Sequence, residues 1–317
     1  MIVPGTGPTH RTLEDLLPAA LRARLDALDL RSLKRFAGVL PGERHAKRKG
    51  RSVEFADYRT YTPGDDLRHI DWKVYARLDR LFLKLFIEEE DLSLHVAIDE
   101  SLSMDAGDPS KLAWAQRLAM SMAYVGLHAR NRVSLSRFGR ERVEVLAECR
   151  GMTSVERVSS FLLEAKGDEG AGRVQHSQPI DQSLRTIATL PRGGGVLVIV
   201  SDMLAREGLE RGLRAVSARP TFDTAIVQVL SPGELDPSIE RTLLMGDMRF
   251  TDAETGDGKE VTVNPALIRR YRERLDAHCL SIERLCHGRD ASYLRASSDT
   301  PIEDVVLGFF RRRGTLR

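Results

Sequence analysis

The chain has 317 residues, of which 42% are hydrophobic and 30% are charged, a balance that excludes a disordered or fibrous protein and is typical of a soluble globular one. Its length allows one large domain or two smaller ones and is sufficient for a sizeable core. The formal net charge of +2 is too small for the overall field to favour nucleic acid or an anionic surface as a partner.

The sequence shows no signal for a membrane span, for secretion or for a disulfide. No run approaches the roughly 20 apolar residues of a membrane span, and the N-terminus lacks the continuous apolar segment of a secretory signal. The three cysteines, Cys149, Cys279 and Cys286, have no metal-ligand spacing. Cys279 and Cys286 are about two helical turns apart, roughly 10 Å, which is too far for a disulfide. We therefore expect buried, reduced thiols and a cytoplasmic protein.

The first 91 residues divide into two segments. Residues 1–38 form a helical segment, because leucines recur at helical spacing over residues 13–36, with Thr12 as the expected N-cap. Residues 39–91 form a β-rich, turn-rich segment that contains a basic loop, Gly42–Arg51. This loop has no interleaved aromatic residues and belongs to no nucleic-acid-binding fold, so we interpret it as a solvated loop or a patch for an acidic partner.

From residue 92 apolar strands alternate with helices. In residues 92–231 we expect strands at 92–99, 132–139, 195–202 and 222–230, a hairpin partner at 142–148, and helices at 110–129, 154–165, 180–190 and 206–218. This alternation predicts an α/β core with helices on both faces of the sheet. Residues 232–317 are expected to complete the core with a hairpin, a helix over 265–285, a short strand and a terminal helix.

Polar residues follow two of the apolar strands. Asp99 ends the first predicted core strand, and Ser101 and Ser103 follow at alternate positions, while Asp202 ends the strand 195–202. Ligands of open α/β sheets bind outside the carboxyl ends of the strands. A carboxylate and two hydroxyls suit Mg²⁺ rather than zinc. The alternative is an ordinary turn and helix cap, since Asp and Ser favour both.

Two motifs resemble known families. The pattern D-x-S-x-S with a later strand-end Asp is similar to the metal-ion-dependent adhesion site of von Willebrand factor A domains. The stretch "GRSVEFADYRTYTPGDDLRHIDWKVYAR" resembles the signature of the domain of unknown function 58 family. The matching residues are Gly50, Phe55, Arg59, Tyr61, Gly64, Asp65, Asp66, Arg68, Ile70, Asp71, Trp72, Ala76 and Arg77. The resemblance covers about residues 35–310, nearly the whole chain.

The resemblance implies a von Willebrand factor A-like (Rossmann-type) doubly wound sheet, preceded by a β-rich segment and followed by a hairpin-plus-helix extension. It also implies a Mg²⁺ or Mn²⁺ ion held by Asp99, Ser101, Ser103 and Asp202. The adhesion site takes a further ligand from a Thr on a second loop; here Gln178 stands at that position, with Ser177 beside it. Members of the family often accompany MoxR-type AAA+ ATPases, which makes such an ATPase and its client proteins the implied partners.

The signature segment allows two interpretations. Asp65, Asp66 and Asp71 could form a second acidic site, but a turn at Pro63-Gly64 stabilised by Asp–Arg pairs with Arg59, Arg68 and Arg77 is favoured. Trp72 and Tyr61 are expected to be packing anchors rather than a ligand cage.

The sequence therefore predicts a metal-dependent protein-binding scaffold, not an enzyme, acting with a MoxR-type ATPase in protein assembly or maturation. No phosphate-binding loop is visible, so any ATP hydrolysis comes from the partner. One alternative is a Mg²⁺-dependent hydrolase or phosphotransferase that uses the same acidic pocket. Another is a structural module whose acidic site holds no metal.

Overall fold

The computed structural model describes residues 12–31, 54–63, 65–87, 92–164, 178–191, 193–205, 207–237, 246–251 and 258–316. The chain divides into two compact units. One consists of residues 1–34 together with 92–317, and the other of residues 35–91. The predicted β-rich segment 39–91 lies within the second unit. In the described residues, no helix is both long enough and apolar enough to cross a membrane.

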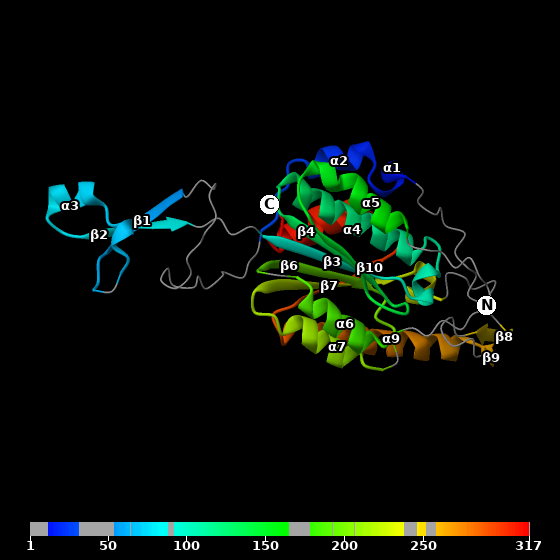
Figure 1. Ribbon diagram of the computed structural model, residues 1–317. Coiled ribbons are helices and arrows are strands. Elements are labelled where there is room, and N and C mark those ends of the chain that lie inside the picture. Colours follow the sequence, from blue (N-terminus) through cyan, green and yellow to red (C-terminus); the bar gives the residue numbers. More distant parts are fainter. Residues whose placement is uncertain are drawn as a thin grey trace. The chain divides into compact units, whose positions relative to one another are not determined.

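A six-stranded sheet forms the centre of the first unit (Figure 1). Its strands, in spatial order, are β10 (Ser292–Ser297), β7 (Phe222–Leu230), β6 (Gly195–Ser201), β3 (Ser93–Asp99), β4 (Arg132–Phe138) and β5 (Glu144–Cys149). All neighbours are parallel except β5, which pairs antiparallel with β4. Numbered along the chain, this order is 3-2-1-4-5-6, that of a Rossmann-type sheet. The predicted doubly wound, von Willebrand factor A-like fold class is therefore confirmed.

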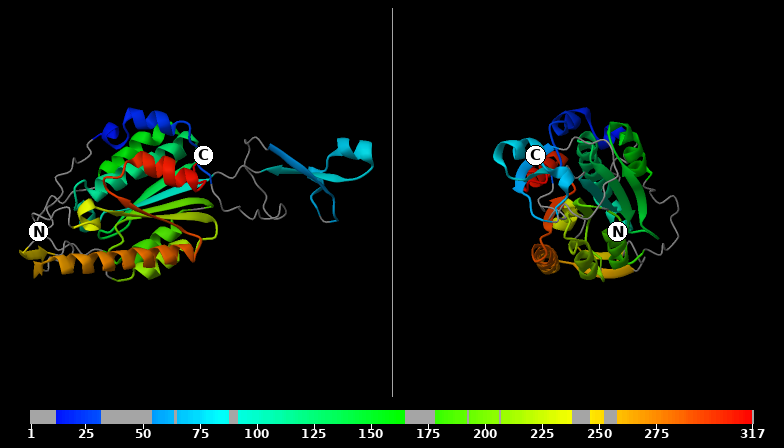
Figure 2. Two further views of the ribbon diagram at one scale, coloured as in Figure 1. Left: turned by 180° about the vertical axis from the view of Figure 1, so that it is seen from behind. Right: turned by 60° about the vertical axis from the view of Figure 1, so that its left-hand side comes forward.

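Helices cover both faces of this sheet, as the views in Figures 1 and 2 show. One face packs against α4 (Lys111–His128), α5 (Val155–Leu163) and the π-helical segment η4 (Asp304–Phe310). The other packs against α6 (Ile180–Thr189), α7 (Leu209–Ser217) and α9 (Pro265–His287). Both faces of β3 and β6 are buried, which explains why apolar residues predominate in these strands. All three cysteines are buried and unpaired, as expected.

The N-terminal helix differs from the prediction. Thr12 caps it, but the helix stops after one turn, α1 (Leu13–Leu16), and resumes as α2 (Ala19–Leu25). Pro18 lies between them and cannot donate a backbone hydrogen bond, so a continuous helix is broken there. Leu30 then forms a β-bridge with Leu316 instead of extending the helix. The leucine spacing was correct as a burial pattern, because Leu16, Leu17, Leu21 and Leu25 all join the core over α4.

The remaining predicted elements are found close to their expected positions. Ser110 caps α4 by accepting a hydrogen bond from the Ala113 N–H. The predicted C-terminal hairpin is β8 (Gly246–Thr251) with β9 (Gly258–Val263), and α9 follows it. The short strand β10 completes the sheet at its β7 edge.

The second unit contains an antiparallel hairpin, β1 (Glu54–Thr60) with β2 (Phe82–Ile87). A 3₁₀ turn, η1 (Leu67–His69), and a two-turn helix, α3 (Trp72–Leu78), lie between the two strands in the sequence. Few side chains are buried here among the described residues of this unit, chiefly Ile70, Asp71 and Leu83.

His95 is a fully buried polar residue in the middle of β3. Its Nδ1 lies 2.7 Å from the Ser134 hydroxyl and its Nε2 lies 2.9 Å from the Ser136 hydroxyl, both on β4. A neutral imidazole can donate one of these hydrogen bonds and accept the other. Burial, helped by the positive charge of Arg219, lowers the pKa of His95 to about 3. The histidine is therefore neutral in the folded protein at ordinary pH.

We expect His95 to make folding sensitive to acid. Its folded pKa of about 3 lies below its unfolded value of 6.5, so the unfolded state binds the extra proton between these values. Stability contributed by neutral His95 is complete above pH 6.5 and falls by about 1.4 kcal/mol per pH unit below it. Urea unfolding of wild type and His95→Gln at several pH values between 7.5 and about 5 measures this. The variant should lose stability less steeply than wild type; parallel curves would contradict the assignment.

Candidate functional site

The candidate site lies where the winding of the sheet reverses. β3 and β6 are adjacent parallel strands, and the chain leaves β3 towards β4 on one side and β6 towards β7 on the other. This is the switch point at which open α/β sheets bind ligands. Asp99 is the last residue of β3 and Asp202 directly follows β6, so the structure brings the two predicted acids to this one edge.

The polar side chains of the turn after β3 converge. The Asp99 Oδ1 accepts a hydrogen bond from the Ser101 N–H at 2.9 Å, which closes the turn into the short segment η2 (Leu102–Asp105). The hydroxyl oxygens of Ser101 and Ser103 then lie 3.1 Å apart. Two adjacent ligands of an octahedral Mg²⁺, each about 2.1 Å from the ion, are separated by about 3 Å. The two serines thus have the separation that a shared cation requires.

Gly139, just after β4, makes this turn possible. Its φ of +93° lies in the left-handed region, and a Cβ there would collide with the Asp99 Oδ1 and the Ser101 backbone. Only glycine combines this backbone conformation with such a close approach. The end of β4 therefore packs directly against the Asp99 turn.

Gln178 reaches the same neighbourhood from the second loop. Its N–H donates to the Arg140 carbonyl at 2.8 Å, one residue after Gly139. Among the residues that the structure describes, the buried Gln178 Oε1 has no hydrogen-bond partner. A buried acceptor of this kind is rare in folded proteins and calls for a donor or an ion. Ser177, the other residue predicted on this loop, lies outside the described residues.

The two carboxylates influence one another. Burial, and then the charge of Asp202, raise the pKa of Asp99 to about 6, and hydrogen bonds from Ser201 and Ser101 oppose the rise. The Ser201 hydroxyl donates to the Asp99 Oδ2 at 2.6 Å. Asp99 thus accepts hydrogen bonds from Ser201 and from both the N–H and the side chain of Ser101, and a carboxylate with about four lone-pair sites retains one for a cation.

Asp202 forms an ion pair with Lys111, a residue that was not predicted from the sequence as part of the site. The Lys111 ammonium is fully buried and contacts the Asp202 Oδ2 at 3.0 Å and the Glu234 Oε1 at 2.6 Å. The other Asp202 oxygen accepts from the Leu204 N–H at 3.2 Å. Burial alone would lower the pKa of Lys111, but the charges of Asp202 and Glu234 together raise it. Asp202 therefore already has a cationic partner, which it shares with Glu234, and it cannot be a direct ligand without giving up part of this pairing.

A second acid, Glu100, lies immediately after Asp99 and is also buried. Its carboxylate oxygens are 3.6 Å from the Arg137 Nε and 3.5 Å from the Arg140 Nε. Burial raises the pKa of Glu100 to about 7, and the two arginines only partly oppose this. Glu100 therefore pairs with the β4 end of the sheet and is not directed to the serines.

The donor set fits a hard cation. A carboxylate and two converging hydroxyls are oxygen ligands of the kind that Mg²⁺ or Mn²⁺ prefers, and the amide oxygen of Gln178, whose backbone lies next to this turn, is of the same kind. In the described parts of the chain, no three His, Cys, Asp or Glu side chains form a group that could hold a metal. A cation here would consequently depend on the serine and glutamine oxygens as much as on Asp99.

The three acids of the signature segment hydrogen-bond to different local groups and do not form one shared site. Asp65 pairs with Arg59 at 2.6 Å and accepts from the Thr62 N–H, while Asp66 caps η1 through the Arg68 N–H. Asp71 caps α3. Each acid thus stabilises a local turn or helix end. Gly64 lies outside the described residues.

The aromatic residues of the signature do not all pack as expected. Tyr61 is half-buried, but Trp72 is 61% exposed within its own unit. The expectation that Trp72 is a packing anchor is wrong for this unit, because a two-turn helix beside a single hairpin has little core to enter.

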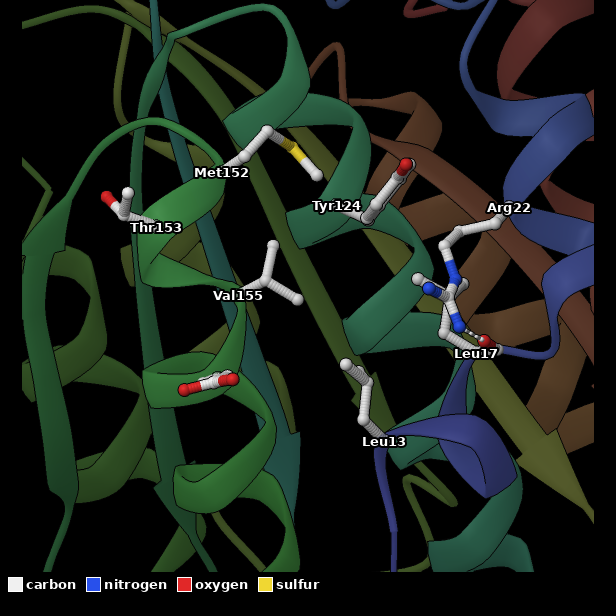
Figure 3. Close-up of a pocket in the computed structure, with 8 residues that line it drawn as sticks. Leu13, Leu17, Arg22, Tyr124, Met152, Thr153 and Val155 are labelled. Atoms are coloured by element: carbon white, nitrogen blue, oxygen red, sulfur yellow. Dashed lines mark hydrogen bonds between the residues drawn. The ribbon is translucent and has the colours of Figure 1, made fainter.

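A separate hollow lies over α4, away from the strand ends (Figure 3). It has a volume of about 500 Å³ and is lined by Leu13, Leu17, Arg22, Tyr124, Met152, Thr153, Val155 and Glu156. Tyr124 is thirteen residues along α4 from Lys111, or about 20 Å. Two of its polar side chains are already engaged: Arg22 pairs with Glu14, and the Tyr124 hydroxyl donates to Asp26. This hollow is not part of the candidate site.

Comparison with protein families identifies the chain's relatives. Residues 57–279 match the model of the family described as protein of unknown function DUF58. The chain belongs to the DUF58 family. The match includes the second half of the signature, the Asp99 turn and Asp202, and so confirms the family resemblance seen in the sequence.

Uncharacterized proteins of Mycobacterium bovis and Mycobacterium tuberculosis are 28% identical to this DUF58 protein over 328 aligned positions, which cover 95% of this chain and 93% of theirs. A Mycobacterium avium protein, also uncharacterized, is 31% identical over 42% of this chain and 88% of its own. Among solved structures, the chain is similar to the conserved hypothetical protein BatB from Bacteroides thetaiotaomicron, with a TM-score of 0.39 and 12% identity over 70% of this chain and 98% of that one. It is also similar to the SpRpn10 VWA domain, with a TM-score of 0.36 and 11% identity over 68% of this chain and 94% of that one.

Sequence reasoning missed Lys111, Glu234 and Ser201. One signal was available for Lys111. A lysine in the first turn of a helix opposes the helix dipole, so it indicates an anionic partner nearby. Ser201 carried a weaker signal, since it is the polar residue that precedes Asp202 on a strand otherwise made of apolar residues and glycine. Glu234 is brought in from more than one hundred residues away and had no such signal.

We expect Lys111→Met to destabilise the protein strongly. Loss of the ammonium leaves buried Asp202 without a counter-charge, which typically costs about 3–5 kcal/mol. Denaturant unfolding measures the change, and Lys73→Met, at an exposed lysine, should stay within about 0.5 kcal/mol of wild type. Adding Asp202→Asn to Lys111→Met should recover part of the loss, because the uncompensated charge is then removed. A Lys111→Met variant as stable as wild type would contradict this role.

Proposed function

We propose that this DUF58 protein is a metal-dependent protein-binding scaffold that acts with a MoxR-type AAA+ ATPase in the assembly or maturation of client proteins. The observation that carries the proposal is the convergence of the Ser101 and Ser103 hydroxyls, 3.1 Å apart, beside the Asp99 carboxylate at the switch point of the sheet. Asp99, Ser101 and Ser103 would hold Mg²⁺ or Mn²⁺ directly. Gln178 would add its unpartnered Oε1, and Asp202, held by Lys111, would act through water.

The charges explain why such a site would bind a protein partner. Lys111 is shared by Asp202 and Glu234, whereas Asp99 has no ion pair described and its carboxylate lies beside Ser101. A divalent ion carries one positive charge more than the single carboxylate, Asp99, that would hold it directly. When bound, the ion supplies positive charge at an open coordination position, which favours a carboxylate from the partner. The loops around the site then determine which partner fits.

Binding is favoured over catalysis by the surroundings of the serines. A nucleophilic serine needs a general base within hydrogen-bond reach. The Ser101 and Ser103 hydroxyls hydrogen-bond to each other, and the Ser101 side chain also hydrogen-bonds to the Asp99 carboxylate, which we propose to be a cation ligand rather than a base. We therefore propose that they are ligands and that the protein is not an enzyme.

The ATPase partnership is supported by family membership and by the sequence. The MoxR-type partner is what the resemblance to the DUF58 family implies, and this sequence has no phosphate-binding loop of its own. A scaffold that presents clients to such an ATPase would need a reversible contact with each of them. A cation that both binds and releases carboxylates meets that need.

We expect Mg²⁺ or Mn²⁺ to bind to the purified protein with one site per chain. Calorimetric titration should show binding by wild type and a loss of at least about tenfold in affinity for Asp99→Asn and for Ser101→Ala. The matched controls are Asp276→Asn and Ser281→Ala, at exposed positions on α9, which should bind as wild type does. No binding at millimolar ion concentration would overturn metal dependence.

We expect the purified MoxR-type ATPase of the same organism to be retained by immobilised wild-type protein in the presence of Mg²⁺. Retention should fall at least about tenfold with EDTA or with Asp99→Ala, since the bridging charge is then missing. If Asp99→Ala and Ser101→Ala retain the ATPase as well as wild type does, with or without Mg²⁺, the metal-bridge model is wrong. Release of phosphate from phosphoesters by wild type but not by Asp99→Asn would instead favour a hydrolase.

A further inference from the structure

Met203, the residue after Asp202, has an unusual backbone conformation. Its φ of +55° lies in the left-handed region, which a residue with a bulky side chain seldom adopts. The Met203 side chain is fully buried, so exposure at a loop tip does not explain the conformation. Strained backbone of this kind persists only where surrounding contacts hold it, and it is concentrated at functional sites. The contacts that hold the Met203 turn therefore bear on the candidate site.

Two side chains from distant elements hold the carbonyl groups of this turn. The Gln228 Nε2, on β7, donates to the Asp202 carbonyl at 2.8 Å, and the Gln228 Oε1 accepts from the Tyr293 hydroxyl of β10 at 2.5 Å. His278, on α9, places its Nε2 2.8 Å from the Met203 carbonyl oxygen. Because a carbonyl oxygen can only accept, the His278 Nε2 carries a proton and donates the hydrogen bond. The turn is thus fixed by side chains of both β7 and α9.

The Met203 turn decides the direction of the Ser201 hydroxyl. The Met203 N–H donates to the Ser201 Oγ at 3.0 Å. A backbone N–H can only donate, so the single hydrogen of the Ser201 hydroxyl is left for another acceptor. That acceptor is the Asp99 Oδ2, at 2.6 Å. Three hydrogen bonds therefore run in one direction, from His278 through the Met203 backbone and Ser201 to Asp99.

We propose that His278 is a positioning residue of the Asp99 site, through which helix α9 controls how tightly the site binds a divalent cation. By holding the Met203 carbonyl, His278 maintains the left-handed turn, and the turn keeps the Ser201 hydroxyl directed at Asp99. The Asp99 carboxylate is then held in one fixed orientation. This inference rests on the cation site proposed above and adds the element that regulates it.

Helix α9 contacts the surroundings of the site at two places. It packs against the same sheet face as α6 and α7 (Figure 1). Besides the contact of His278, the Tyr271 hydroxyl donates to the Glu234 carbonyl at 3.0 Å. Glu234 is the second partner of Lys111, so a shift of α9 would alter both contacts at once. The hydrogen bonds described for His278 and Tyr271 end on backbone carbonyls and not on a proposed cation ligand, so their effect on ion binding is indirect.

The alternative is that His278 only stabilises the fold. A half-buried side chain that donates to a backbone carbonyl is a common contact in proteins. Positioning is favoured because the carbonyl belongs to a left-handed turn directly after Asp202, and because two further hydrogen bonds connect this turn to Asp99. A purely structural contact alters stability, whereas a positioning contact alters ion affinity in a way that depends on Ser201.

Calorimetric titration with Mn²⁺ alone tests the proposal. We expect His278→Leu to weaken Mn²⁺ binding at least about tenfold, as changes behind metal ligands typically do. His278→Gln should bind within about threefold of wild type, because a glutamine amide supplies a donor in place of the histidine Nε2. The matched control is His287→Leu, at an exposed histidine of the same helix, which should bind as wild type does. Wild-type affinity of His278→Leu, or equal losses in the Leu and Gln variants, would refute the proposal.

A double-mutant cycle separates positioning from stability. Ser201→Ala should itself weaken Mn²⁺ binding, and adding His278→Leu should then change the affinity by less than about twofold, because the connection to Asp99 is already broken. A purely structural histidine would lower the affinity by the same factor in both backgrounds, which would overturn the proposal. Urea unfolding checks that each variant is folded. If His278→Leu does not fold, His278→Asn replaces it, because its shorter amide cannot reach the Met203 carbonyl.

Hydrogen exchange in the absence of divalent ions gives a readout that does not depend on ion binding. The Met203 N–H should be protected in wild type by its hydrogen bond to Ser201. His278→Leu should speed this exchange at least about tenfold and His278→Gln should not, because loss of the carbonyl contact frees the turn. Unchanged exchange in His278→Leu would overturn the positioning role. If wild type binds no Mn²⁺, the scaffold function fails, whereas faster exchange in His278→Leu would still support the control of the Met203 turn by α9.

Discussion

Two buried carboxylates at adjacent strand ends are the constraint on which the centre of this protein depends. β3 and β6 run parallel and side by side, so Asp99 and Asp202 meet at one sheet edge, and burial and mutual repulsion raise the pKa of Asp99 to about 6. Removing two like charges from water costs several kcal/mol per ion unless each is paired. The surrounding structure supplies that pairing through Ser201, the Ser101 backbone and the Lys111 ammonium. Glycine at position 139 leaves the space in which the Asp99 turn fits.

The two carboxylates are paired in different ways, and this difference makes the site asymmetric in charge. Asp202 shares the Lys111 ammonium with Glu234 of α8 (Pro232–Leu235). Asp99 has only hydrogen bonds described for it, and its carboxylate lies beside the Ser101 turn. The cation that we propose would therefore lie on the Asp99 side of the site, away from the lysine.

The signature segment is stabilised in a different way from the central sheet. Its acids cap η1 and α3 and pair with Arg59, which orders short elements that have almost no core of their own. The energy that an ordinary domain gains from burial is largely missing here, since a hairpin and a two-turn helix cannot enclose their apolar side chains. Local hydrogen bonds can hold such a unit in shape while its aromatic residues stay at the surface.

Local patterns in the sequence determined most of the fold. The apolar strands, the caps at Thr12 and Ser110 and the alternation of strands with helices were all readable, because each depends on residues close together in the chain. The placing of Asp99, Ser101, Ser103 and Asp202 at one edge followed from strand order. Tertiary structure alone decided that Lys111 neutralises Asp202, that Gln178 Oε1 is left without a partner, and that Trp72 is exposed in its unit. The first two depend on groups brought together from distant parts of the chain. The exposure of Trp72 depends on the lack of a sizeable core in its unit. Neither cause produces a periodic pattern in the sequence.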